Sequence, residues 1–252
     1  MTALSINLNK IALIRNSRDT EYPSVAIHAA RCIASGANGI TVHPRPDQRH
    51  IRADDCYELA SMIEVEFNIE GNPFAPATKS ARPGVSDYPG FMEIIRLTKP
   101  AQCTLVPDTN SQLTSDHGFD LQQDGDRLAP IIAELKNLGV RVSLFMDPSP
   151  TQIRLAKDIG ADRIELYTGP YAESFGSQHQ DNILNQFIEA SDVAYEVGLG
   201  LNAGHDLNLH NLFLFKNSVR NLLEVSIGHA FTIDAIEMGL DNCIKSYLSC
   251  LR

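Results

Sequence analysis

Short apolar runs rich in β-branched residues alternate with amphipathic stretches along the whole chain. The runs predict strands at 4–9, 39–43, 66–70, 102–106, 141–145, 163–167, 198–202 and 223–227. Apolar positions at helical spacing between them predict helices at 24–35, 53–63, 88–97, 127–138, 151–159, 182–197, 208–216 and 230–251. Glycines that follow a helical stretch and precede a strand mark the expected helix ends, at Gly36, Gly139, Gly160 and Gly198.

This alternation indicates parallel strands joined by right-handed crossovers. Eight strand–helix units in 252 residues are typical of an α/β fold of the (β/α)₈ barrel type. An open doubly wound sheet is the weaker alternative, because no glycine-rich loop follows the first strand. We find no linker or break in composition, so we expect a single domain over 1–252. Segment 107–125 is too long for an ordinary strand–helix loop, which suggests a binding loop or a lid.

Polar residues occur late in most of the predicted strands, where buried parallel strands should be continuously apolar. Where one strand carries two of them they are two positions apart and therefore share a face. Side chains at the carboxyl ends of barrel strands form the active sites of such enzymes. We therefore expect an active-site floor built from Asn7, Asn9, Thr41, His43, Asn68, Glu70, Thr104, Ser143, Glu165, Tyr167, Asn202 and Ser226.

Segment 39–50 is the most informative stretch of the sequence. A short β-branched strand ends in His43, and two nearby prolines prevent it from continuing as strand or helix. Arg45, Asp47, Arg49 and His50 follow within seven residues. Proton carriers and anion-binding groups at the end of an apolar strand predict a functional site rather than an ordinary solvated loop.

Two further loops suggest binding of a phosphate group. Gly228 and His229 follow the eighth strand and open the last helix, where free backbone N–H groups can receive an anion. His205 follows the seventh strand and can exchange a proton near neutral pH. Arg15, Arg18 and Lys10 follow the first strand, where the arginines belong either to a solvated helix start or to a second phosphate clamp.

Charge and cysteine content narrow the possible partners. The net charge of −10 argues against nucleic acids and anionic membranes, and no apolar run is long enough to span a bilayer. The five cysteines form no C-x-x-C pair, which predicts reduced thiols in the cytoplasm, and we expect no secretory signal. A metal site is a further alternative with a plausible ligand set, although no local metal-binding motif joins its members: His43, His50, Glu70, Glu165 and His205.

Taken together and in order, these segments resemble the pyridoxine 5′-phosphate synthase family of vitamin B6 biosynthesis. The resemblance covers nearly the whole chain. The matching positions are, in order, Asn7, 11–12, 15–18, 39–43, Arg45, Asp47, 49–51, 68–70, 105–107, 142–145, 164–169, 202–205 and 227–230. It implies a (β/α)₈ barrel with extra helices that assembles into a homo-octamer. The implied reaction condenses 1-deoxy-D-xylulose 5-phosphate with 3-amino-2-oxopropyl phosphate, releasing water and phosphate, without a metal or organic cofactor.

The resemblance also implies individual roles. His43 and Glu70 would accept protons, His205 would donate one, and Glu165 would steady a cationic intermediate. The deoxyxylulose phosphate would be held by Arg45, His50 and Thr114. The amino-ketone phosphate would be held by Asn7, Arg18, Gly228 and His229. Histidines and carboxylates in one shielded pocket suit the repeated proton transfers that imine formation, elimination and ring closure require.

Two departures from the family pattern concern substrate contacts. The family usually carries an Asp-His pair where this chain has Asn9 and Lys10, and a glycine where it has Asp206. Lys10 could replace a histidine as a cationic donor. Asp206 would repel a phosphate unless its side chain turned away, for instance to cap a helix beginning at Leu207.

Two other functions compete with this interpretation. A different phosphosugar barrel enzyme, such as an aldolase or epimerase, would turn over a single substrate. A catalytically inactive barrel would bind a phosphorylated metabolite or a protein partner without forming product.

Overall fold

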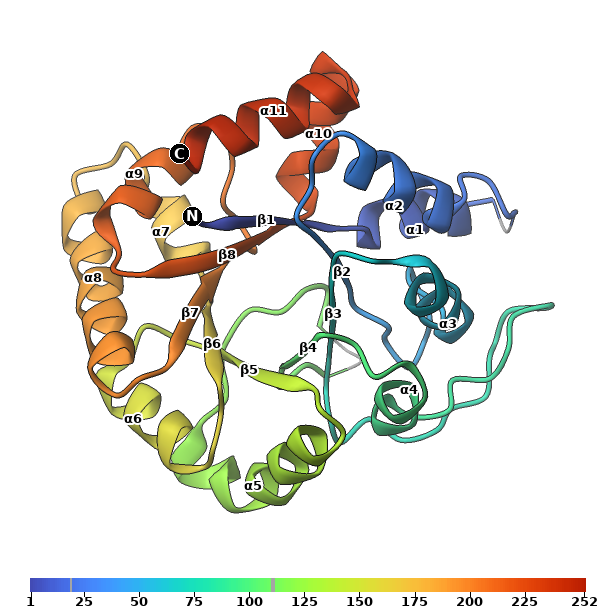
Figure 1. Ribbon diagram of the computed structural model, residues 1–252, viewed down its shortest axis with the longest axis horizontal. Helices are drawn as coiled ribbons and strands as arrows, with labels where there is room; N and C mark the ends of the chain where they lie inside the picture. Colours follow the sequence, from blue (N-terminus) through green and yellow to red (C-terminus); the bar gives the residue numbers. More distant parts are fainter. Residues whose placement is uncertain (19, 110–111) are drawn as a thin grey trace.

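The computed structural model describes residues 1–18, 20–109 and 112–252. Within these residues eight parallel strands pair in chain order, and β1 closes the barrel by pairing with β8. Figure 1 shows the strands as an inner ring. Their bounds are β1 Ala3–Asn7, β2 Gly39–Val42, β3 Glu66–Gly71, β4 Gln102–Leu105, β5 Arg141–Met146, β6 Arg163–Leu166, β7 Gly200–Ala203 and β8 Leu222–Ile227. The predicted (β/α)₈ barrel with extra helices is confirmed.

Helices surround the barrel on the outside (Figure 1). They are α1 Asn9–Asn16, α2 Val25–Ala34, α3 Ala53–Met62, α4 Phe91–Thr98, α5 Leu121–Asn137, α6 Pro150–Asp158, α7 Gly169–Ser174, α8 Gln180–Glu196, α9 Leu212–Ser218, α10 His229–Met238 and α11 Leu240–Cys250. Outward strand residues such as Ile40 and Val42 are fully buried and belong to the core between strands and helices. None of the described helices has the length and apolar character needed to cross a bilayer.

Most predicted elements are found, with the clearest differences at their ends. The four predicted helix-terminating glycines all have positive φ angles, from 75° to 110°. The last helix, expected over 230–251, is two helices separated by Gly239, whose φ of 81° breaks the helical path. Helix α5 begins at Leu121, six residues before the predicted start. The loop expected over 107–125 therefore ends at residue 120. Residues 110 and 111 of that segment lie outside the described residues.

The first strand ends earlier than predicted. It stops at Asn7, and Asn9 begins helix α1 instead of continuing the strand. The Asn7 side chain accepts a hydrogen bond from the Asn9 backbone N–H at 3.0 Å, which turns the chain into the helix. Asn9 and Lys10 therefore reach the barrel mouth from a helix start.

The polar strand residues form two layers rather than one floor. Thr41, Asn68, Thr104, Ser143 and Asn202 are buried below the functional pocket and do not line it. Thr104 donates to the Asn68 side chain at 3.1 Å, and Thr41 lies 2.7 Å from the Ser5 hydroxyl. The expectation that these five belong to the active-site floor was wrong, because they lie deeper in the barrel than the cavity lining. Hydrogen bonds satisfy much of this lower layer, although the Ser143 hydroxyl has no partner among the described residues.

Candidate active site

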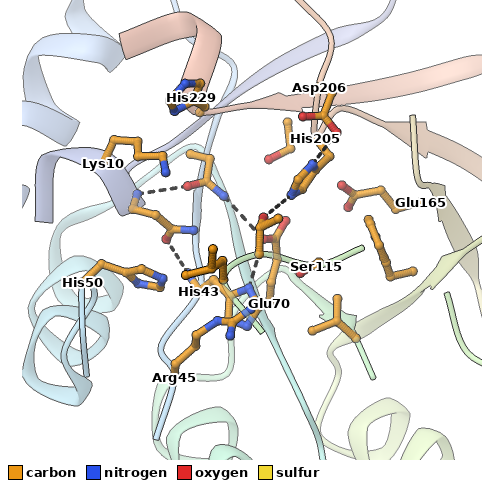
Figure 2. A pocket seen from close by; sticks show the side chains of 18 residues that line it. Lys10, His43, Arg45, His50, Glu70, Ser115, Glu165, His205, Asp206 and His229 are labelled. Atoms are coloured by element: carbon orange, nitrogen blue, oxygen red, sulfur yellow. Dashed lines mark hydrogen bonds and ion pairs between the residues drawn. The ribbon is translucent and has the colours of Figure 1, made fainter. Parts of the chain in front are cut away.

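A cavity of about 280 Å³ opens at the carboxyl ends of the strands (Figure 2). This is the face on which barrel enzymes carry their chemistry. The cavity is lined by predicted site residues Asn7, Asn9, Lys10, His43, Arg45, His50, Glu70, Thr114, Glu165, His205, Asp206, Gly228 and His229, together with Val106, Leu113, Ser115, Phe145 and Ser226. Of the residues predicted to act on or bind substrate, Arg18 is absent from this lining, and Tyr167 of the predicted floor lines an adjoining pocket instead.

His43 stands at the centre of the side built by β2 and β3. Its backbone N–H donates to the Asn9 side chain at 2.9 Å, which ties the end of β2 to the start of α1. Its Nδ1 lies 3.9 Å from Glu70 Oε2. Burial, with a contribution from Arg45, lowers the pKa of His43 to about 3. His43 is therefore neutral at physiological pH and has a free nitrogen lone pair, while burial makes it a weaker base than an exposed histidine.

Glu70 is the last charged residue of β3 and faces the same cavity. Asn7 donates to its Oε2 at 3.4 Å. Burial, followed by the repulsion of Glu165, raises the pKa of Glu70 well above its ordinary value. These surroundings favour the protonated carboxyl, and a cationic ligand group would favour its ionisation.

Glu165 projects from β6 toward the cavity on the other side. Burial raises its pKa to about 7, while His205 acts in the opposite direction. Its Oε2 is buried and has no hydrogen-bond partner among the residues that the structure describes. An unpartnered carboxylate oxygen that titrates near neutrality is suited to receive a positively charged group.

Arg45 is buried and binds the loop that follows β4. It contacts Asp108 and donates to the Gln112 carbonyl oxygen at 2.8 Å. Asp108 also accepts from the Ser115 hydroxyl at 2.9 Å, and His43 Nε2 lies 3.6 Å from Asp108 Oδ2. The sequence analysis missed Asp108, although a carboxylate shortly after a strand is the signal that identified residues on other strands.

His50 reaches the cavity beside His43, with the ring centroids 6.2 Å apart in an edge-on arrangement. Its Nδ1 accepts the backbone N–H of Ile51 at 2.9 Å. Burial, followed by the proximity of His43, lowers the pKa of His50 well below its ordinary value. The neutral ring then carries its hydrogen on Nε2, which makes this nitrogen a donor to a ligand.

His205 lies at the end of β7 and has a partner on each ring nitrogen. Its Nε2 is 2.7 Å from the Thr114 hydroxyl, and its Nδ1 is 2.7 Å from the Asp206 carboxylate. The Asp206 side chain therefore turns to the histidine. The suggestion that it caps a helix starting at Leu207 was wrong, because helix α9 begins at Leu212.

The start of α10 forms the opposite edge of the cavity. Gly228 precedes this ten-residue helix, and His229 is its first residue. A Cβ atom on Gly228 would lie 3.0 Å from the Asn7 Cβ, so the glycine permits a close approach of β8 to β1. The first N–H groups of a helix attract anions. In Figure 2, His229 and Arg45 lie on opposite sides of the cavity.

The two arginines of the first loop lie away from the cavity. Arg15 is buried and bound to Asp55 at 2.9 Å, so its role is structural and the idea that it clamps a phosphate was wrong. Arg18 is exposed beyond the end of α1. It does not line the cavity, so its contact with the amino-ketone phosphate stays a prediction.

Comparison with known proteins identifies the family. Residues 4–252 match the family model described as "Pyridoxal phosphate biosynthesis protein PdxJ". The chain belongs to the PdxJ family. It is 54% identical to pyridoxine 5′-phosphate synthase of Xanthomonas campestris pv. campestris strain B100, over 99% of this chain and 96% of that protein. It is 50% identical to the enzyme of the same name from Xylella fastidiosa strain M23, over 99% and 95%.

Solved structures outside the PdxJ family share the barrel alone. Phosphoribosylanthranilate isomerase from Thermotoga maritima matches with a TM-score of 0.58 at 13% identity, covering 100% of this chain and 98% of that one. KGPDC from Streptococcus mutans matches with a TM-score of 0.59 at 11% identity, covering 100% and 97%. In the described residues, no group of three or more His, Cys, Asp or Glu side chains has an arrangement that could hold a metal ion.

Proposed function

We propose that this PdxJ family member is a pyridoxine 5′-phosphate synthase that condenses 1-deoxy-D-xylulose 5-phosphate with 3-amino-2-oxopropyl phosphate, releasing water and inorganic phosphate. Relatives that are 50–54% identical to this chain have that name, and the alignments cover nearly their full length. The observation that carries the proposal is one cavity with His43, Glu70, Glu165 and His205 between two regions suited to phosphate. We propose that no metal or organic cofactor takes part.

The two proposed phosphate regions differ in construction. Arg45, His50 and Thr114 would hold the deoxyxylulose phosphate through a guanidinium, an imidazole N–H and a hydroxyl. Gly228, His229 and the Asn7 amide would hold the amino-ketone phosphate at the start of α10. Lys10 lines the same cavity and adds a cation where the family usually has a histidine. The Asn9 side chain supports His43 by accepting a hydrogen bond from the His43 backbone N–H.

The proposed proton transfers follow from the surroundings of each group. Attack of the substrate amine on a ketone releases a proton, which neutral His43 can accept. Loss of the carbinolamine hydroxyl as water requires a donor, and His205 is placed to supply that proton. The resulting iminium cation would be steadied by Glu165, whose free oxygen is available to it. A cationic intermediate would also favour the ionised form of Glu70 and allow it to accept a proton before ring closure.

Assembly and location complete the proposal. We propose a homo-oligomer, as the family resemblance implies, with an octamer as its expected size. Helices α1 and α10 lie in contact and expose apolar side chains to solvent: Leu13, Ile14, Ile233 and Ile236. An exposed apolar group of this kind marks a contact surface. The five cysteines are free and four are buried, which supports a reducing compartment such as the cytoplasm.

A turnover assay tests the proposed reaction. Purified protein, treated with a chelator and dialysed, is mixed with both phosphorylated substrates, and pyridoxine 5′-phosphate is followed by mass and absorbance together with released phosphate. We expect product only when both substrates are present. Binding of each substrate without product would support an inactive barrel instead. Turnover of either substrate alone would support a phosphosugar aldolase or epimerase.

A further inference from the structure

The backbone of the loop after β7 is held on both sides of Asp206. The Asp206 N–H donates to the buried Thr168 hydroxyl at 3.4 Å, and the Asn211 side chain donates to the Asp206 carbonyl oxygen at 3.4 Å. A Cβ atom on Gly204 would lie 2.0 Å from the Ser226 carbonyl oxygen, so β7 and β8 approach closely just before the loop. The position of Asp206 relative to His205 is therefore set by the fold.

The His205 ring is also enclosed by aromatic side chains. Its centroid lies 6.3 Å from that of Phe145 and 5.7 Å from that of Tyr167. With Asp206 on Nδ1 and Thr114 on Nε2, the two aromatic rings leave it little freedom to rotate. An ionised carboxylate only accepts hydrogen bonds, so the contact with Asp206 requires the hydrogen to be on Nδ1.

We propose that Asp206 is a positioning residue that makes Nε2 the one nitrogen of His205 that exchanges protons with the substrate. This inference rests on the proposed function of the cavity. With Nδ1–H held by the carboxylate, the neutral ring presents an Nε2 lone pair to the cavity, and the cationic ring presents an Nε2–H. In the donor step, the Nε2–H proton passes to the departing hydroxyl oxygen of the carbinolamine. The C–O bond breaks with its electron pair on that oxygen, water leaves, and the ring remains neutral with its hydrogen on Nδ1.

The exposure of the pair supports a positioning role over a stabilising one. The His205 and Asp206 side chains are 25% and 40% exposed. Ion pairs this open to water add little to stability. Other charged or titratable groups facing His205 come from neighbouring elements: Glu165 on β6, Tyr167 after β6, Asp108 after β4 and His43 after β2. Asp206, by contrast, lies at hydrogen-bonding distance from a ring nitrogen of His205.

Ring ¹⁵N chemical shifts of histidine test the position of the hydrogen without any need for turnover. Protein with ¹⁵N-labelled histidine is studied at a pH where the ring is neutral, and the His205 signals are assigned by their loss in His205→Gln. We expect hydrogen on Nδ1 in the natural protein and a shift of population toward Nε2–H in Asp206→Ala. Asp206→Asn, whose amide oxygen can still accept, should lie between them. The same hydrogen position in the natural protein and Asp206→Ala would overturn the proposal.

Kinetics of the same variants test the consequence. We expect Asp206→Ala to lower kcat by about tenfold or more with both KM values nearly unchanged, and Asp206→Asn to lower it less. Glu173→Gln is the matched control, because it removes an exposed acidic charge from α7 at the same mouth without touching His205. A kcat loss no larger than that of the control, or a lower KM with unchanged kcat, would overturn the proposal. Absence of product from the natural protein would instead refute the proposed function, while the ring shifts would still decide the position of the hydrogen.

Discussion

Two histidines at the same cavity have opposite surroundings. His43, after β2, is 5% exposed, and burial with the nearby Arg45 lowers its pKa to about 3. His205, after β7, is partly open to water and holds a carboxylate on one nitrogen and a hydroxyl on the other. The first environment keeps the ring neutral. The second fixes the ring and leaves one nitrogen available for exchange, so position in the barrel, rather than residue type, distinguishes their roles.

The two buried glutamates differ in a similar way. Glu70 is contacted by the Asn7 amide, and its pKa is raised by burial and by Glu165. Glu165 has one oxygen with no partner in the described part of the chain, and its pKa is about 7. Each side of the cavity therefore pairs one histidine with one carboxyl group whose proton is held more tightly than in water. Variants that alter one side of the cavity at a time should separate the proton-transfer steps assigned to the two sides.

The largest effect is expected on the His43 side, from Glu70→Gln. The amide keeps the size of the side chain but cannot accept a proton, so kcat should fall by about a thousandfold with a small change in either KM. Single-turnover measurements with substrate binding measured in parallel would check this. Turnover close to that of the natural protein would remove Glu70 from the mechanism.

Glu165→Gln should reveal the cost of the carboxylate on the other side. The pKa of Glu165 in the folded state, about 7, exceeds its unfolded value of about 4.3, so the fold loses stability as pH rises between these values. Removing the charge should stabilise the fold at pH 8 by at most roughly 4 kcal/mol and have little effect at pH 4. Urea unfolding at both pH values measures the difference. A variant that is equally or less stable at pH 8 would contradict the assigned burial cost.

The sequence was sufficient to predict the barrel and most of the site because both depend on local patterns. Strand–helix alternation predicts the topology, and polar residues at strand ends identify His43, Glu70, Glu165 and His205. The family resemblance supplied Thr114, which lies far from the other residues in sequence. The division of the strand polar residues into two layers could not be predicted, because it depends on the depth of each residue along the barrel axis.

The contacts made by acidic loop residues were equally hidden in the sequence. Asp108 binds Arg45 across the mouth, and Asp206 turns to its neighbour His205 rather than to a helix end. The partner of each carboxylate depends on which basic side chain lies next to it in the folded loops. Arg15 shows the converse, since a positive residue near the site is occupied by Asp55 in the neighbouring helix α3.

Arg45→Ala should weaken binding on the His43 side with a smaller effect on the chemical step. Loss of the guanidinium should raise the KM for deoxyxylulose phosphate by roughly tenfold or more, with kcat less affected. It should also destabilise the protein, because Asp108 would remain buried without its cation. Adding Asp108→Asn should restore stability but not affinity. An unchanged KM in the single variant would remove Arg45 from the phosphate site.

Gly228→Ala, at the opposite edge of the cavity, should give the smallest effect and should change the KM of one substrate only. The added methyl group would stand 3.0 Å from the Asn7 Cβ, and the φ of −128° does not itself exclude alanine. Asn7 must therefore shift by a few tenths of an ångström, which disturbs its contact with Glu70 as well as the start of α10. The KM for the amino-ketone phosphate should rise a few-fold, roughly 1 kcal/mol in binding, while that for deoxyxylulose phosphate stays the same. Gly125→Ala in α5 is the control, because its new Cβ would meet only Ile159 at an ordinary 3.7 Å. A shift confined to Asn7 and α10 can distinguish the substrates only if each phosphate has its own site. Equal changes in both KM values would therefore mean that the two phosphate regions are not separate.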